Sequence, residues 1–238
     1  MADIELNNLT FTYPGSTEPV IDNLSLHIPA GESHALLGAS GAGKTTLLNL
    51  LSGIEHPQSG TVLFDGQDVT QLGGRDRKVA QVFQFPVLYE SLNVSANISF
   101  PLQNLNLGRQ EIVERVRYIA QELNISELLD RSPQSLSLFE KQLVAVAKAL
   151  VRPDLSVVLL DEPLTAVEPK IKWQLRRALR NVKRDLGVTM IYVTHDQTEA
   201  LTFADRVSVL TAEGILQTDT PEQIYHNPTH EFVGHFIG

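Results

Sequence analysis

The chain has 238 residues, 42% of them hydrophobic and 20% charged, which is the composition of a folded protein with one large domain or two small ones. Its formal net charge is −9 and its Lys and Arg residues are scattered, so we do not expect nucleic acid to be a partner. The sequence has no cysteine, which excludes disulfides, thiolate catalysis and cysteine metal sites and fits a reducing compartment.

The first part of the chain predicts a β layer followed by a strand and a helix. Residues 4–28 carry apolar side chains in a strand-like pattern and predict antiparallel strands. A continuous apolar run at 33–37 predicts a buried strand, and the helical run 46–51 follows it after a glycine-rich loop. Short strands are expected at 59–66 and 79–83.

The middle of the chain is expected to be helical. From 109 to 124, apolar residues recur at helical spacing with charged residues between them. A second helix is expected at 139–150, before the Arg-Pro-Asp sequence that begins at Arg152. These runs predict a mostly helical subdomain at roughly 88–150, inserted between the strands.

The last third of the chain alternates strands with helices. The runs at 156–160 and 188–193 are apolar at nearly every position, as in a parallel sheet that is covered on both faces. Further strands are expected at 207–210 and 215–217, and helices at 169–186 and 196–203. The chain is therefore predicted to be an α/β protein with a mainly parallel central sheet, an N-terminal antiparallel β layer and the inserted helical subdomain.

The glycine-rich loop is the strongest motif in the sequence. It fits the phosphate-binding pattern of a glycine, four residues and Gly-Lys-Thr, and it reads Gly38, Ala39, Ser40, Gly41, Ala42, Gly43, Lys44 and Thr45. Glycines allow backbone N–H groups and the start of the following helix to approach a polyphosphate. Lys44 would add a charge for the phosphates, and the Thr45 hydroxyl is placed for Mg²⁺. The alternative, a glycine-rich turn with an exposed lysine, does not explain the full match and the strand and helix around it. The motif predicts a P-loop NTPase.

Two acidic residues follow the apolar strand at 156–160. Asp161 and Glu162 stand at its carboxyl end, where α/β sheets place their ligands. In a nucleotide site the first carboxylate can hold Mg²⁺, and the second can accept the proton of an attacking water. On their own the two residues could be an ordinary strand exit, but the phosphate loop upstream favours the catalytic interpretation.

In the order of its motifs the whole chain resembles the nucleotide-binding subunit of an ATP-binding cassette (ABC) transporter, above all the ATPases of bacterial importers for sugars, polyols and glycerol phosphates. The resemblance implies ATP and Mg²⁺ as ligands. It places an adenine-stacking aromatic at Tyr13 and extends the nucleotide site to Thr46. It also assigns Gln84 to Mg²⁺ and the attacking water, Asp161 to the metal and Glu162 to catalysis, and His195 to the γ-phosphate. The implied catalytic residues are Lys44, Glu162 and His195, and the implied metal ligands are Thr45, Gln84 and Asp161.

Three of these residues carry little signal on their own. Tyr13 alone could be a surface ring, Gln84 alone means nothing, and His195 alone could be a hydrogen-bonded structural histidine. Their order relative to the phosphate loop is what favours the nucleotide-binding interpretation.

The sequence departs from the family at its signature motif. The family has Leu-Ser-Gly-Gly-Gln where this chain has Leu-Ser-Leu-Phe-Glu, so the signature residues are Ser137, Leu138, Phe139 and Glu140. In the family this motif opens a helix that closes over the γ-phosphate held by the other subunit. The side chains of Leu138 and Phe139 are expected to occupy that space, and Glu140 adds a negative charge that opposes the helix dipole's attraction for an anion, worth ~0.3–1 kcal/mol.

A second departure follows Glu162. The family has Pro-Leu-Ser-Ala-Leu-Asp where this chain has Thr165 and Glu168 in place of the serine and the aspartate. The residues that serve the chain's own nucleotide are thus intact, and those offered to a partner are altered. We therefore expect a heterodimer with a second ATPase chain whose signature keeps both glycines. A homodimer with two weak sites is the rival interpretation.

The resemblance also implies partners and a location. The transmembrane permease subunits would dock near residues 84–89, and a periplasmic or extracellular solute-binding protein would act indirectly. No run approaches the about 20 apolar residues of a spanning helix, and the start lacks signal-peptide features, so we expect a soluble chain at the cytoplasmic face of the inner membrane. The family's C-terminal regulatory domain is expected to be absent, because the chain stops after 232–238.

Two other functions stay open. Related ATPase domains act in DNA repair or translation without a transporter, so a soluble mechanical ATPase is one alternative. A mainly regulatory ATP-binding subunit is the other, because the signature is poor. The presence of Glu162 argues against the second.

Overall fold

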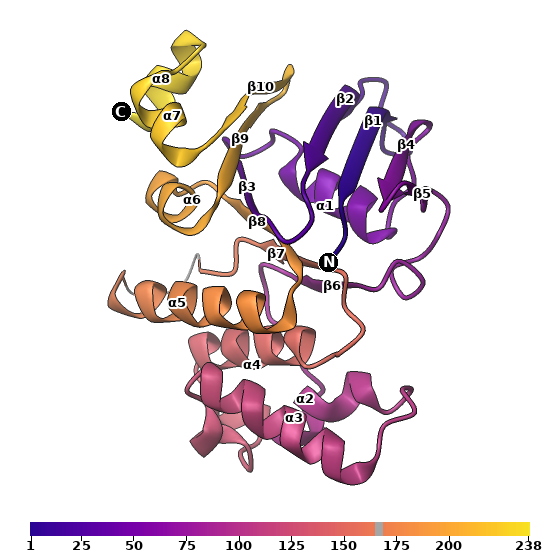
Figure 1. Cartoon of the computed structure of the whole chain (residues 1–238), viewed down its shortest axis with the longest axis vertical. Coiled ribbons are helices and arrows are strands. Elements are labelled where there is room, and N and C mark those ends of the chain that lie inside the picture. Colours follow the sequence, from indigo (N-terminus) through magenta and orange to yellow (C-terminus); the bar gives the residue numbers. More distant parts are fainter. Residues whose placement is uncertain (165–168) are drawn as a thin grey trace.

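The computed structural model describes the backbone of residues 1–164 and 169–238, and it leaves out the side chains of 169–171 and 174. The predicted departures at Thr165 and Glu168 lie outside the described residues. Two sheets and the helices around them make up the chain (Figure 1).

The smaller sheet is the expected antiparallel β layer. Its four strands lie in the order β2 (Ile21–Ile28), β1 (Ile4–Phe11), β4 (Ser59–Phe64) and β5 (Gln67–Asp68). Within β1 the buried residues do not alternate strictly, because the register shifts between Leu6 and Leu9. Asn8, with φ +51°, lies in this irregularity and returns Leu9 to the buried face.

The larger sheet is mainly parallel, as predicted. Its order is β10 (Gly214–Asp219), β9 (Arg206–Thr211), β3 (Ser33–Leu37), β8 (Thr189–Thr194), β7 (Val157–Asp161) and β6 (Val79–Val82). Only the pairing of β10 with β9 is antiparallel. Strands β3, β7 and β8 are buried at every position, as expected for strands covered on both faces. The α/β fold class predicted from the sequence is confirmed.

Helix α1 (Lys44–Ser52) joins the two sheets. It begins at the lysine of the glycine-rich loop, two residues before the predicted start at Thr46. Its leucines at 47, 48, 50 and 51 belong to one core with side chains from β1, β2, β3 and β7. The start of α1 is therefore fixed relative to both layers.

A buried arginine ends α1. The guanidinium of Arg77 donates to the carbonyls of Leu50 at 2.6 Å and Leu51 at 3.0 Å, which are among the last carbonyls of the helix. It also donates to the carbonyls of Thr70 at 2.8 Å and Leu72 at 2.7 Å. Burial lowers the pKa of Arg77 to about 10, with Asp68 acting in the opposite direction, so the group stays charged at neutral pH. A cation at the C-terminal end of a helix is well placed for the helix dipole.

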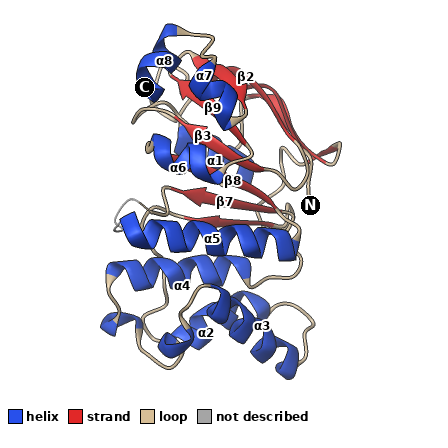
Figure 2. Ribbon diagram, turned by 60° about the vertical axis from the view of Figure 1, so that its left-hand side comes forward, coloured by secondary structure: helices blue, strands red, loops and turns tan. Residues whose placement is uncertain are grey.

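The other face of the large sheet carries the helical part of the chain. It contains α2 (Val94–Ser99), α3 (Arg109–Glu122), α4 (Leu138–Leu150) and α5 (Pro169–Leu186), with 3₁₀ turns at Phe100–Leu102, Ser126–Leu128 and Pro133–Ser135. Figure 2 shows α5 beneath β7, α4 beneath α5, and α2 and α3 farthest from the sheet. Side chains of these helices and of β7 and β8 share one core.

Three short helices cover the edge near β9. They are α6 (Gln197–Phe203), α7 (Pro221–His226) and α8 (Glu231–Ile237), and their buried residues pack on β3 and β9. Among the described residues, no helix combines the length and the apolar character that crossing a bilayer requires.

Candidate functional site

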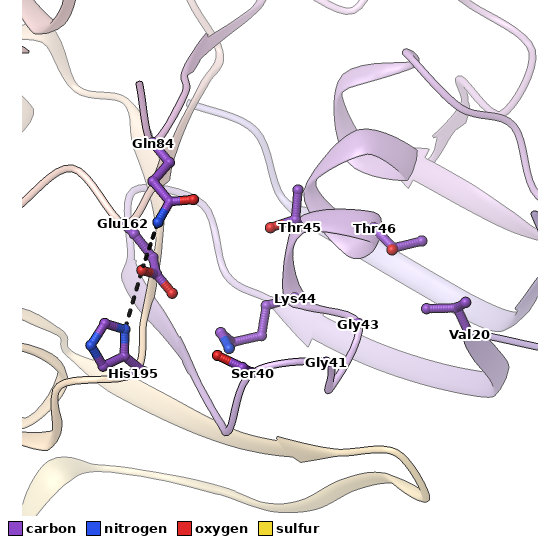
Figure 3. A pocket seen from close by; sticks show the side chains of 10 residues that line it. All are labelled: Val20, Ser40, Gly41, Gly43, Lys44, Thr45, Thr46, Gln84, Glu162 and His195. Atoms are coloured by element: carbon purple, nitrogen blue, oxygen red, sulfur yellow. Dashed lines mark hydrogen bonds and ion pairs between the residues drawn. The ribbon is translucent and has the colours of Figure 1, made fainter. Parts of the chain in front are cut away.

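A pocket of about 480 Å³ lies at the start of α1, facing the ends of β7 and β8. In Figure 3 the glycine-rich loop forms one side, and the side chains that follow β6, β7 and β8 form the other. The lining residues are Val20, Ser40, Gly41, Gly43, Lys44, Thr45, Thr46, Gln84, Glu162 and His195.

Two glycines of the loop are required for different reasons. A Cβ on Gly38 would lie 2.2 Å from the carbonyl oxygen of Leu210, so only glycine lets the loop pass β9. Gly43, the residue before α1, has φ +87°, a conformation that favours glycine. No side chain caps the start of α1. The first N–H groups of the helix therefore face the pocket without a capping side chain, as a bound anion requires.

Lys44 reaches back over the loop. Its ammonium group donates to the carbonyls of Gly38 at 2.8 Å and Ala39 at 2.9 Å. Burial lowers the pKa of Lys44, although the nearby charges of Glu162 and Asp161 act in the opposite direction. The ammonium thus lies at the loop, within the pocket, where a phosphate would meet it.

Asp161 lies beneath the pocket at the end of β7. Its side chain is buried and accepts a hydrogen bond from Thr45. Burial raises the pKa of Asp161, and the neighbouring charge of Glu162 adds to the rise, while Thr45 and Lys44 lower it. A carboxylate that burial disfavours becomes a better ligand for a cation that neutralises it.

These oxygen donors fit Mg²⁺. Asp161, Thr45 and Gln84 offer a carboxylate, a hydroxyl and an amide oxygen, the hard ligands that Mg²⁺ prefers. Within residues 1–164 and 169–238 no three acidic or histidine side chains cluster tightly enough to hold a metal alone.

Glu162 contacts two other site residues on the far side of the pocket. Its Oε2 atom lies 3.1 Å from Nδ1 of His195 and accepts a hydrogen bond from Gln84 Nε2 at 3.4 Å (Figure 3). The three residues come from the ends of β7, β8 and β6. Glu162 has φ +44°, uncommon for a residue with a side chain, and its N–H is held by the carbonyl of Val193 at 3.0 Å.

The opposite end of the pocket is formed by Val20 and Thr46. Tyr13 does not line the pocket; its hydroxyl lies 3.1 Å from Thr46 Oγ1, and its ring meets Phe11 edge-on. Adenine stacking by Tyr13 stays a prediction. Val20 was not singled out from the sequence, because one valine before a strand has no distinguishing pattern.

The signature residues lie outside the pocket, at the start of α4. Ser137 and Glu140 form a reciprocal cap. One oxygen of Glu140 accepts from the Ser137 N–H at 2.7 Å and from the Ser137 hydroxyl at 2.9 Å, and the hydroxyl accepts from the Glu140 N–H at 3.2 Å. These hydrogen bonds, with Arg131 3.3 Å from the carboxylate, lower the pKa of Glu140. A carboxylate of the same chain therefore takes the donors that Ser137 would offer to another anion.

The two residues between them differ in direction. Leu138 is 53% exposed, whereas Phe139 packs against the core of the helical part. Phe139 is only partly buried, so the expectation that both side chains occupy the space in front of α4 stays a prediction. Leu138 is the more exposed of the two.

Comparisons with known proteins identify the family. The family profile described as ABC transporter matches residues 21–165. The chain is 40% identical to the diacetylchitobiose uptake system ATP-binding protein MsiK of Streptomyces coelicolor, over 100% of this chain and 63% of that protein. It is 41% identical to the spermidine/putrescine import ATP-binding protein PotA of Pseudomonas aeruginosa, over 99% and 64%.

A solved structure shares the fold. It is that of cbiO1 from Clostridium perfringens, described as part of the ABC transporter complex cbiONQ, with a TM-score of 0.85, 29% identity, and coverage of 93% of this chain and 89% of that one. The chain spans less than two thirds of the length of the two curated relatives, 63% and 64%. Because the profile covers more than half of this sequence and the relatives match it nearly end to end, the chain belongs to the ABC transporter family.

Proposed function

We propose that this chain binds and hydrolyses ATP as a subunit of an ABC importer for a small polar solute. ATP with Mg²⁺ is the general ligand pair of this family. The observation that carries the proposal is the convergence of Gln84 and His195 on the Glu162 carboxylate, across the pocket from Lys44.

Each side chain has a task that its position supports. Lys44 would exchange its two carbonyl contacts for phosphate oxygens. Glu162 would accept the proton of a water whose oxygen attacks the γ-phosphorus, while the bond to the β-phosphate oxygen breaks and ADP leaves. Gln84 would orient that water, and His195 would contact the γ-phosphate. When bound at Asp161 and Thr45, Mg²⁺ would draw negative charge from the phosphate oxygens.

Binding and turnover can be tested separately. Lys44→Ala is expected to lose tight Mg·ATP binding in calorimetry, whereas Glu162→Gln keeps binding and loses turnover by about 10²-fold or more. His230→Gln is a control, because this histidine caps α8, away from the pocket. Full turnover in Glu162→Gln, or no binding heat for the unsubstituted chain, would contradict the proposal.

The surface next to Gln84 supports docking to permease subunits. Phe85 is 72% exposed and Val87 62% exposed, directly after Gln84. Beside them a groove of about 250 Å³ is lined by Phe83, Val87, Pro101, Ala145, Lys148 and others. Exposed aromatic and aliphatic side chains next to a groove are typical of a protein interface. A permease subunit docked at this surface would lie beside Gln84, the residue that contacts Glu162. This chain would then lie at the cytoplasmic face of the membrane.

Docking can be tested by co-purification from cells with the permease subunits. Phe85→Ser is expected to reduce co-purification at least about tenfold, the effect of removing one aromatic anchor. Tyr225→Ser removes a comparably exposed aromatic ring, on α7, and is expected to have no effect. Equal losses in both variants would mean that the chain does not dock through the segment after Gln84.

The solute is proposed to be a sugar, a polyol or a glycerol derivative, delivered by a solute-binding protein. Relatives support this class through their names, which include diacetylchitobiose uptake and sn-glycerol-3-phosphate import. Others at similar identity are named for spermidine and putrescine import. Binding of sugars, polyols, glycerol derivatives and polyamines can be measured on the complex of this chain with its permease subunits. Binding of polyamines alone would overturn the carbohydrate assignment.

We further propose that the working assembly is a heterodimer with a second ATPase chain. The cap between Glu140 and Ser137 and the exposed Leu138 support it, because they leave this chain with a poor surface for a partner's nucleotide. The chain alone is expected to turn over ATP slowly and without cooperativity. Fast, cooperative turnover by the purified chain would contradict the heterodimer, and slow turnover by a stable dimer of this chain would favour the homodimer.

A further inference from the structure

A buried carboxylate lies close to the backbone around His195. Glu199, on α6, is only 2% exposed. Its Oε2 atom accepts from the hydroxyls of Tyr192 and Thr194, each at 2.9 Å. Its Oε1 atom accepts from the ammonium of Lys172, on α5, at 2.6 Å. A buried carboxylate requires such partners to remain charged.

The same network holds both neighbours of His195. Thr194 donates to Glu199, and its hydroxyl accepts from the Asp196 N–H at 3.0 Å. Asp196 accepts from the Glu199 N–H at 3.2 Å as the cap of α6, and from Lys172 at 3.2 Å. Lys172 thus bonds to Asp196, the residue after His195, and to Glu199. Glu199 in turn accepts a hydrogen bond from Thr194, the residue before His195.

The ring of His195 depends on this backbone. Its side chain is 52% exposed, so packing does not fix it, although its Nδ1 atom meets Glu162. The N–H of Glu162 is bonded to the carbonyl of Val193, on the same strand β8 that leads into His195. The way residues 194–196 are held against α5 therefore affects the direction in which the imidazole faces Glu162.

The position of Lys172 is not explained by its own helix. It is the fourth residue of α5, near the positive end of the helix dipole, where a cation is disfavoured. Burying an ion pair also gives little net stability compared with an apolar pair. The hydrogen bonds and charge of Glu199 overcome the effect of burial and raise the pKa of Lys172. The ammonium is held there by its partners around His195.

We propose that Lys172 is a positioning residue for His195: from the first turn of α5 it fixes, through Glu199 and Asp196, the backbone that aims the imidazole at Glu162. The inference rests on the proposed role of His195 in ATP hydrolysis. It also links His195 to α5, the helix that follows Glu162 in the sequence.

The direct test observes the His195 ring. The imidazole resonances of the chain, which has seven histidines, are recorded by NMR, and His195→Gln assigns the signal. Lys172→Met is expected to shift and broaden this signal, and Lys172→Arg to retain it. Lys183→Met is the matched control, because Lys183 also lies on α5 and pairs with Asp205 at 2.7 Å, away from His195. An unchanged His195 signal in a folded Lys172→Met variant would overturn the proposal.

A milder variant covers the case in which Lys172→Met fails to fold. Tyr192→Phe removes one hydrogen bond to Glu199 and leaves the packing in place. It is expected to shift the same signal less. A Tyr192→Phe spectrum identical to that of the unsubstituted chain would also count against the proposal.

Kinetics separate positioning from general destabilisation. Lys172→Met is expected to lower kcat by roughly 10–100-fold, the scale of a catalytic group displaced by about 1 Å, with little change in KM for ATP. Equal changes in Lys172→Met and Lys183→Met would indicate a structural role only. If His195→Gln itself leaves kcat unchanged, the proposed role of His195 fails, while the NMR comparison still decides whether Lys172 positions the ring.

Discussion

Glu140 occupies the donors of Ser137: a single carboxylate oxygen accepts from the Ser137 N–H at 2.7 Å and from its hydroxyl at 2.9 Å. Removing that charge and the apolar side chain beside it should restore a donor surface. Leu138→Gly combined with Glu140→Ala, which removes both the charge and the acceptor oxygen, is expected to raise turnover by the chain alone about tenfold or more, the scale of regained oxyanion donors.

The control for this gain is Glu127→Gln, which neutralises an exposed carboxylate of the 3₁₀ turn at Ser126–Leu128. Phe139 is left in place because its partly buried ring packs against the core of the helical part. Unchanged turnover in a double variant that still binds Mg·ATP would mean that α4 does not limit the rate.

Arg77 should be a major contributor to stability. Arg77→Met removes the donors from four carbonyls around the end of α1 and is expected to lower the free energy of unfolding by about 3 kcal/mol. Arg75→Met, two residues away and exposed, is the matched control and should change it by less than about 0.5 kcal/mol. Urea unfolding measures both, and equal effects would contradict the capping role.

Two glycines of the loop should respond differently to alanine. Gly41 has φ +83° but open space around its Cβ position, so Gly41→Ala is expected to cost about 1–2 kcal/mol from backbone strain alone. Gly38→Ala places a methyl group 2.2 Å from the Leu210 carbonyl oxygen and should displace β9 or the loop. Thermal melting is expected to rank Gly38→Ala clearly below Gly41→Ala, and the reverse order would contradict this packing.

The raised pKa of Asp161 predicts opposite pH responses with and without Mg·ATP. The folded chain takes up a proton at Asp161 above the ordinary value of about 3.9. As the pH falls through this raised pKa, the proton competes with Mg²⁺ and Mg·ATP affinity drops. The ligand-free chain gains stability from the same group over that interval, because the folded state binds more protons than the unfolded state.

Asp161→Asn should remove both pH effects that arise from this group. Calorimetry at a series of pH values follows the affinity, and melting of the ligand-free chain follows the stability. A ligand-free Asp161→Asn variant that loses stability at neutral pH, compared with the unsubstituted chain, would contradict the cost assigned to the buried charge.

Local patterns predicted most of the layers and the phosphate loop. Residues 33–52 carry a buried strand, a glycine motif and a helix in one continuous stretch, so their arrangement follows from local rules. Gln84, Glu162 and His195 were predicted as site residues because the motifs follow the order of the family. The structure places these three together, while their roles in catalysis stay predictions.

What the sequence did not reveal depends on contacts between distant segments. Arg77 looks like a surface residue until the fold places four carbonyls around it. Glu199 and Lys172 are separated by 27 positions, and neither is unusual on an amphipathic helix. The shift at Asn8 changes the face of a strand through one backbone angle, which no hydrophobic pattern encodes.

The left-handed backbone at Glu162 lowers the stability of the fold at a residue that the proposed hydrolysis requires. Most residues with a side chain carry a conformational penalty at this position, about 1–2 kcal/mol, which glycine escapes. Glu162→Gly is therefore expected to melt above Glu162→Ala, although neither can accept a proton from water. Glu162 therefore lowers the stability of the fold while it supplies the carboxylate that the proposed hydrolysis uses.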